Sequence, residues 1–309
     1  MAVTDRRYKM RPLQKPPLVV AAVCDRRDLL EIIMLRRSQS AATGLLQRSQ
    51  NMKETVLVTG ASSGIGLELA KCFAAGQSNL ILVARNTAAL ETLAAELRRE
   101  HGIEVHVVTA DLARPDSPQK IFDELKGRGT VVDVLVNNAG FGLHGGFAEL
   151  PLARQLEIIQ VNVAALVALT GLFLPGMVQR KSGGILNVGS VAGFLPGPNM
   201  AVYYASKAFV QSFSEALFEE LRGTGVGVTN LCPGPTESNF SQIARTYQTR
   251  TMPIAKMSAA EVAAAGHRAF RAGRCVNVPG AKNFFLAQLT RILPRATIRK
   301  VVGRYNRLK

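Results

Sequence analysis

The chain has 309 residues, of which 47% are hydrophobic, and a formal net charge of +16. This length suits one large α/β domain with extensions, and four widely spaced cysteines without a C-x-x-C pair argue against a zinc site and a disulfide framework. The charge lies at the ends: residues 1–51 carry +6 and residues 268–309 carry +11, whereas residues 52–267 carry −1. A basic groove for nucleic acid along the domain is therefore not expected.

Residues 1–51 place Arg pairs around a short apolar run, Leu18 to Cys24. The run is too short for a secretory signal, and no small-residue cleavage site follows it. Two readings stay open for this extension. It is an amphipathic targeting segment, or it is a disordered or non-native addition with Met52 as the natural start, because Met52-Lys53-Glu54 leads directly into the first predicted strand.

From residue 52 onward, short runs rich in Val, Ile and Leu alternate with helical stretches. The runs lie at 55–59, 79–84, 103–109, 132–136, 184–189, 226–231 and 275–278. This alternation predicts an α/β fold with a doubly wound (Rossmann) parallel sheet of about seven strands, in one domain over 52–280. Val163 to Val178 is almost wholly apolar, but Asn162 and Pro175 favour a buried helix over a membrane span.

The first strand runs into Thr59-Gly60-Ala61-Ser62-Ser63-Gly64-Ile65-Gly66, which opens a helical pattern. Glycine permits the tight turn and the close approach of a pyrophosphate, which then meets free N–H groups and the positive end of the helix dipole. The segment therefore predicts a dinucleotide site. An ordinary glycine-containing loop is the alternative if the run stood alone.

Three further segments follow: Asn137-Asn138-Ala139-Gly140, then Ser190, then Tyr203-x-x-x-Lys207. With the T-G-x-x-x-G-x-G spacing of the glycines, the chain resembles the short-chain dehydrogenase/reductase family over about residues 52–280. The resemblance implies an NAD(P)-dependent enzyme that interconverts C=O and CH–OH. It also implies a homodimer or homotetramer, paired through the apolar helix near 163–178.

The end of the second strand bears on the choice of cofactor. It reads Leu82-Val83-Ala84-Arg85-Asn86, with an arginine and no acid. An acid would bind the two ribose hydroxyls, whereas the planar donors of Arg85 suit a 2′-phosphate, so NADP is predicted, with NADPH preferred over NADH. A solvent-facing arginine is the alternative.

By resemblance, Asp111 and Leu112 contact the adenine; a helix N-cap is the alternative for Asp111. Pro233, Gly234 and Thr236 contact the nicotinamide end, although Pro235 departs from the usual family pattern. The complete predicted cofactor set is Gly60, Ser62, Ser63, Gly64, Ile65, Gly66, Arg85, Asp111, Leu112, Asn138, Ala139, Gly140, Tyr203, Lys207, Pro233, Gly234 and Thr236. The four histidines show no ligand spacing, so no metal is implied.

The predicted reaction centre contains a phenol and an ammonium. Tyr203 and Lys207 stand four residues apart in a helical pattern over 203–222, so both side chains project from one face. A nearby cation should lower the pKa of the phenol from about 10 and make Tyr203 a usable acid/base. Ser190 would bind the substrate oxygen. By resemblance, Lys207 also holds the ribose, and Asn162 holds a water that relays protons.

The predicted substrate walls are apolar, and their residues are Phe141, Leu143, Phe194, Leu195, Met200 and Phe240. They favour an apolar ketone or alcohol, under a lid over 236–257. A 3-oxoacyl reductase acting on a carrier-protein or CoA ester and a catalytically silent NADP-binding regulator are the alternatives. The compartment expected from cysteine usage is the cytoplasm.

The tail, residues 281–309, repeats apolar residues at helical spacing among arginines. A basic amphipathic helix of this kind can lie on an anionic membrane as a peripheral contact. It can equally pack its apolar side on the domain, or dock an acidic carrier protein. The three readings stay open.

Overall fold

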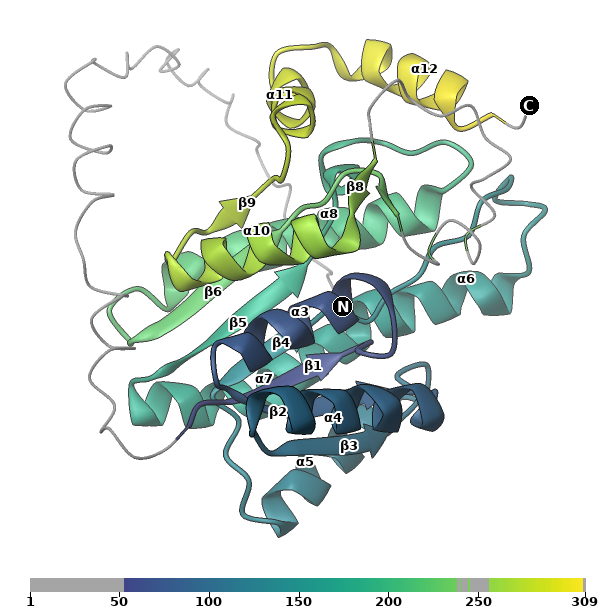
Figure 1. The fold of residues 1–309 in the computed structure, drawn as a ribbon. Helices are drawn as coiled ribbons and strands as arrows, with labels where there is room; N and C mark the ends of the chain where they lie inside the picture. The colour runs from purple at the N-terminus through teal and green to yellow at the C-terminus, as the bar shows by residue number, and fades with distance from the viewer. Residues whose placement is uncertain (1–52, 238–239, 241–243, 245–255, 308–309) are drawn as a thin grey trace, which may run out of the picture. The chain divides into compact units, whose positions relative to one another are not determined.

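The computed structural model describes residues 53–237, 240, 244 and 256–307, so the predicted extension over 1–51 lies outside the described residues. Its centre is a seven-stranded parallel sheet in the order β3-β2-β1-β4-β5-β6-β9 (Figure 1). The strands are β1 (Thr55–Thr59), β2 (Asn79–Ala84), β3 (Val105–Thr109), β4 (Val134–Asn137), β5 (Gly183–Val188), β6 (Val226–Leu231) and β9 (Val276–Asn277). The predicted fold class is confirmed. The strand order reverses between β1 and β4, where such sheets bind ligands at the carboxyl ends of their strands.

Helices cover both faces of the sheet. One face packs on α3 (Gly64–Ala75), α4 (Thr87–His101) and α10 (Ala259–Arg271), and the other on α5 (Ser117–Gly127), α7 (Ala165–Arg180) and α8 (Ala201–Glu220). Side chains alternate along each strand, so Val56 and Val58 enter the first layer and Leu57 the second. Burial on both faces explains why the strands are continuous apolar runs.

The long apolar stretch forms α6 (Leu152–Ile159), a π-helical segment η1 (Gln160–Ala164) and α7. Among the described helices, Leu152–Arg180 is long and apolar enough to cross a membrane. However, Leu169, Phe173 and Met177 are buried in the layer between α7 and the sheet. One face of this stretch is thus buried against the sheet, whereas Leu152, Leu156 and Val167 are exposed, and pairing with a second copy stays a prediction.

The tail forms two helices, α11 (Ala281–Leu289) and α12 (Arg295–Tyr305), drawn in yellow in Figure 1. Pro294 precedes α12; it lacks an N–H and cannot continue the preceding helix, so the predicted helical pattern is interrupted there. Ile298 and Val302 pack with Leu195. Of the three alternatives for the tail, packing of its apolar side on the domain is therefore observed for Ile298 and Val302 of α12.

Two short strands border the predicted lid. β7 (Thr236–Glu237) and β8 (Met257–Ser258) pair in parallel. The two ends of this stretch therefore form strands, although no regular secondary structure was predicted there. Most of the chain between them lies outside the described residues. A 3-10 helix, η2 (Val191–Phe194), follows β5 and completes the elements around the carboxyl edge of the sheet.

Candidate active site

A cavity of about 680 Å³ opens at the carboxyl ends of the central strands. Its size suits a small-molecule or cofactor site. All predicted catalytic and cofactor-binding residues line it except Gly66 and Asn162. The lining residues among them are Gly60, Ser62, Ser63, Gly64, Ile65, Arg85, Asp111, Leu112, Asn138, Ala139, Gly140, Ser190, Tyr203, Lys207, Pro233, Gly234 and Thr236. The fold therefore brings segments from across the chain to one place.

The glycine loop has the backbone that a diphosphate needs. Gly60 and Gly64 adopt left-handed conformations, with φ of +66° and +58°, which side chains rarely tolerate. Ser63 precedes α3 in an extended conformation, and its side chain makes no capping hydrogen bond. The first N–H groups of α3 thus have no side-chain cap, and Ser63, Gly64 and Ile65 line the cavity. Such a helix terminus fits a dinucleotide diphosphate.

Gly66 supports this loop from behind. A Cβ on Gly66 would lie 2.3 Å from Asn138 Nδ2 and 2.4 Å from the Gly60 carbonyl oxygen. Asn138 in turn donates from Nδ2 to the carbonyl of Thr59 at 2.8 Å. The absence of a side chain at Gly66 therefore lets α3 rest directly on the loop and on the residue after β4.

The opposite end of the cavity is lined by residues that follow β2 and β3. Arg85 is exposed directly after β2, whereas Asn86 caps α4 by accepting from the Ala89 N–H at 3.1 Å. Asp111 accepts from the Ala113 N–H at 3.1 Å in a tight turn. The N-cap of α5 is Asp116, so the N-cap alternative for Asp111 is wrong, and its carboxylate belongs to the cavity wall.

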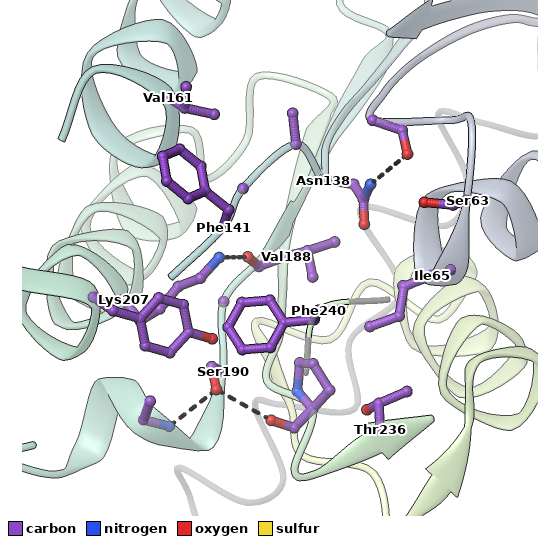
Figure 2. Close-up of a pocket in the computed structure, with 18 of the residues that line it drawn as sticks. Ser63, Ile65, Asn138, Phe141, Val161, Val188, Ser190, Lys207, Thr236 and Phe240 are labelled. Carbon is purple, nitrogen blue, oxygen red and sulfur yellow. Dashed lines mark hydrogen bonds between the residues drawn. The ribbon is translucent and has the colours of Figure 1, made fainter. Parts of the chain in front are cut away.

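At the reaction end, Tyr203 and Lys207 are both buried on α8, and Ser190 follows β5 as the N-cap of η2. Ser190 Oγ accepts from the Ala192 N–H at 3.1 Å and donates to the Pro233 carbonyl at 3.4 Å (Figure 2). The second bond is long. The Ser190 hydroxyl is thus held at the cavity by a firm acceptor contact and a weak donor contact.

Lys207 points into the same region, and its Nζ donates to the Val188 carbonyl at 2.7 Å (Figure 2). Burial lowers the pKa of Lys207 to about 8. Burial also raises the pKa of Tyr203, and the hydrogen bond with Ser190 acts against that rise. The expectation that Lys207 lowers the pKa of Tyr203 is therefore corrected: burial dominates, and the group that favours the phenolate is Ser190.

Asn162 lies on the π-helical segment η1, a kind of irregularity that often occurs at functional sites. Its amide bonds the backbone of Phe141 in both directions, at 3.1 Å and 3.0 Å, and donates to Ser206 Oγ at 3.0 Å. A Cβ on Gly140 would lie 3.0 Å from Asn162 Oδ1 and 3.5 Å from Lys207 Nζ. Asn162 thus sits behind the cavity wall and holds the chain after β4.

The predicted apolar wall is present in part. The predicted wall residues that line the cavity are Phe141, Leu195, Met200 and Phe240. In the view of Figure 2, Phe240 appears between Lys207 and Ile65. The Phe240 ring lies 5.1 Å from the ring of Tyr203. Leu143 instead lines a separate pocket of about 40 Å³, and Phe194 lines neither.

The lining residues that sequence reasoning missed at this end include Tyr204, Leu286, Tyr305 and Asn306. Asn306 donates to the Pro198 carbonyl at 2.9 Å and to the Tyr204 hydroxyl at 3.4 Å. These contacts join the end of α12 to chain that lies about a hundred residues earlier. No local pattern signals such a contact, although the regular spacing of Ile298 and Val302 indicated that one face of the tail needed cover.

Comparison with known proteins agrees with this arrangement. The family model for short chain dehydrogenases matches residues 54–248. Sulfoacetaldehyde reductase 2 from Chromohalobacter salexigens is 40% identical over 62% of this chain and 76% of its own length. A very-long-chain 3-oxoacyl-CoA reductase from Anas platyrhynchos is 31% identical over 81% of this chain and 79% of its own length. A short-chain dehydrogenase from Sphingobium yanoikuyae, solved with NADPH, is 35% identical, covers 77% of this chain and 94% of that one, and has a TM-score of 0.69.

The fold and the cavity therefore define a nicotinamide-dependent oxidoreductase acting on a carbonyl or alcohol. The chain belongs to the short-chain dehydrogenase/reductase family.

Proposed function

We propose that the protein is an NADP(H)-dependent oxidoreductase that transfers a hydride between nicotinamide and an apolar ketone or secondary alcohol, with Tyr203 as the acid/base. The observation that carries the proposal is the buried phenol of Tyr203, which lies beside Ser190 in a cavity that Lys207 and apolar side chains also line. A pure binding module would have no use for a phenol in this position.

The nicotinamide, when bound, supplies or accepts the hydride. At neutral pH Tyr203 is protonated, because burial raises its pKa, so it can donate its proton to the oxygen of a substrate carbonyl. Ser190 makes only a 3.4 Å bond to the Pro233 carbonyl, so its hydroxyl can turn to the same oxygen. Ser190 acts against the rise in the pKa of Tyr203, so it also favours the phenolate that remains after transfer.

Asn162 is proposed as a positioning residue for this proton path. A Cβ on Gly140 would lie 3.0 Å from Asn162 Oδ1 and 3.5 Å from Lys207 Nζ, so both atoms face the space beside Gly140 that such a Cβ would fill. A water bridging these two atoms would connect Lys207 to Asn162, which itself donates to Ser206 on α8. The amide of Asn162 meanwhile fixes Phe141 and so the wall of the cavity.

NADP as the preferred cofactor is supported by Arg85, which follows β2 where an NAD enzyme would carry an acid. Arg85 is exposed at the cavity edge, so its planar donors can reach a 2′-phosphate. The Sphingobium yanoikuyae relative solved with NADPH supports the same preference.

An apolar substrate is supported by the side chains of Phe141, Leu195, Met200 and Phe240. The very-long-chain 3-oxoacyl-CoA reductase relative favours the alternative of a 3-oxoacyl substrate, which the same walls would accept. Sulfoacetaldehyde, named for the other relative, is small and anionic and would leave these walls uncovered. The silent regulator remains the rival from another class. We further propose a homodimer or homotetramer, which the exposed Leu152 and Leu156 on α6 support, and a cytoplasmic location, which rests on cysteine usage alone.

The test is turnover of purified protein with NADPH and a panel of ketones and 3-oxoacyl esters of increasing chain length. Tyr203→Phe removes the proton donor and should lower kcat by roughly 100-fold or more while NADPH still binds. Tyr204→Phe is the matched control, because the neighbouring phenol also lines the cavity; its loss should be far smaller. Undiminished turnover of Tyr203→Phe would overturn the assignment, and no turnover of the unmodified protein on any ketone would favour the silent regulator.

A further inference from the structure

The outer side of the tail helices is apolar although the inner side is packed. Ile298 and Val302 face Leu195, whereas Ile292 is 81% exposed and Phe285 is 69% exposed. The exposed large apolar residues of the tail lie on α11, on α12 and on the turn between them, and they are Phe284, Phe285, Leu289, Ile292, Leu293 and Val301. We call this set the tail face. Exposed apolar surface of this kind marks an interaction site.

The charged side chains of the tail itself have one sign. Residues 262–309 contain no Asp or Glu, and the exposed cations near the face are Lys282, Arg291, Arg295, Arg299, Lys300 and Arg304. In the part of the chain that the structure describes, none of these cations lies within ion-pair distance of a carboxylate. These unpaired positive charges beside exposed apolar side chains favour binding of a negatively charged partner.

We infer that the tail face binds the surface of an anionic phospholipid bilayer. Aromatic and aliphatic side chains among Lys and Arg are the pattern of helices that lie in the membrane interface. A second copy of the chain fits poorly, because two acid-free basic faces repel each other. Ile292 and Phe285 project outward, so they can enter the boundary between headgroups and acyl chains.

The tail face is also connected to the cavity, and this part of the inference rests on the proposed function. Leu286 of α11 and Tyr305 of α12 line the cavity from the inner side of the same helices. Asn306 fastens the end of α12 to Pro198 and Tyr204 at the substrate end. A bilayer bound to the tail face would therefore lie against one wall of the substrate site, where an apolar ketone dissolved in lipid can reach it.

The test is cosedimentation of the full chain with vesicles of phosphatidylcholine alone and with added phosphatidylglycerol. We expect binding that requires phosphatidylglycerol and weakens with salt. Arg291→Glu with Arg295→Glu should weaken it by roughly five-fold or more for each cation. Phe285→Ser with Ile292→Ser should weaken it at equal charge. The matched control is Arg99→Glu with Lys126→Glu, two exposed cations on α4 and α5, which should bind like the unmodified protein.

Absence of binding to the anionic vesicles overturns the inference, as does binding that the tail-face variants leave unchanged. The inference is also overturned if a tail-face variant dissociates an oligomer, or if it no longer binds an acidic carrier protein but still binds vesicles. Either result would identify a protein partner instead. Turnover of a water-soluble ketone without vesicles separates the two proposals. Normal turnover without vesicle binding would refute only the membrane-binding inference. Vesicle binding without turnover would refute only the proposed reaction.

Discussion

The packing of Gly66 allows a sharp test of how the dinucleotide site is built. In Gly66→Ala, the new Cβ would lie 2.3 Å from Asn138 Nδ2 and 2.4 Å from the Gly60 carbonyl oxygen. Both distances are about 1 Å or more below ordinary contact, and one partner is backbone. The helix α3 must therefore move off the loop. Overpacking costs about 1–3 kcal/mol, which exceeds the gain of about 1 kcal/mol that Ala brings to a helix.

Because the first turn of α3 is part of the proposed diphosphate site, the shift should raise the Kd for NADPH by at least about ten-fold, or 1.4 kcal/mol. Titration of NADPH fluorescence measures the affinity, and thermal unfolding measures the stability. Gly171→Ala in α7 is the matched control, since among the described residues nothing beyond the adjacent backbone of its own helix lies within 4 Å of its added Cβ; it should bind NADPH normally and unfold at the same or a higher temperature. If Gly66→Ala bound NADPH as tightly as the unmodified protein, α3 would not hold the diphosphate.

Two further outcomes are expected. Arg85→Glu should lower kcat/KM with NADPH by roughly ten- to a hundred-fold through loss of charged hydrogen bonds, while kcat/KM with NADH falls little; an unchanged ratio of the two would make Arg85 a solvent-facing residue. Lys207→Met tests the buried ammonium. Burial lowers the pKa of Lys207 from its ordinary 10.5 to about 8, so between these values the unfolded chain binds more protons, and this group makes the stability of the folded chain rise with pH. Raised pKa values of Cys232 and Tyr203 act in the opposite direction in both proteins, so urea unfolding at pH 7.5 and pH 9.5 should show a change in stability that is more favourable in the unmodified protein than in Lys207→Met; equal pH dependence in the two proteins would place the pKa of Lys207 near its ordinary value.

The sheet could be predicted because both of its faces are buried. Each strand is then a continuous run of apolar residues, and such runs stand out between amphipathic helices. The glycine loop could be predicted for a similar local reason: Gly60 and Gly64 need left-handed backbone, and few sequences place two such residues between a strand and a helix. Both signals lie within a few consecutive residues.

The electrostatics of Tyr203 and Lys207 could not be predicted from spacing. Four residues along a helix place two side chains on one face, but the spacing does not say which acceptor the ammonium meets. In the fold, β5 brings the Val188 carbonyl to 2.7 Å from Lys207 Nζ. The pKa of Tyr203 depends on how deeply α8 is buried, which is a property of the packed domain and not of the helix.

The two ends of the cavity differ in how the chain builds them. Gly60, Arg85 and Asn138 come from turns that directly follow strands, so the sheet fixes the dinucleotide end and the short motifs reveal it. The substrate end is completed by Leu286 of α11 and by Asn306, which reaches it because the end of α12 packs on the chain near Pro198. Side chains that meet across a hundred residues leave no motif. The identity of the substrate therefore depends on the part of the chain that family motifs describe least, and the tail face is the outer surface of that same part.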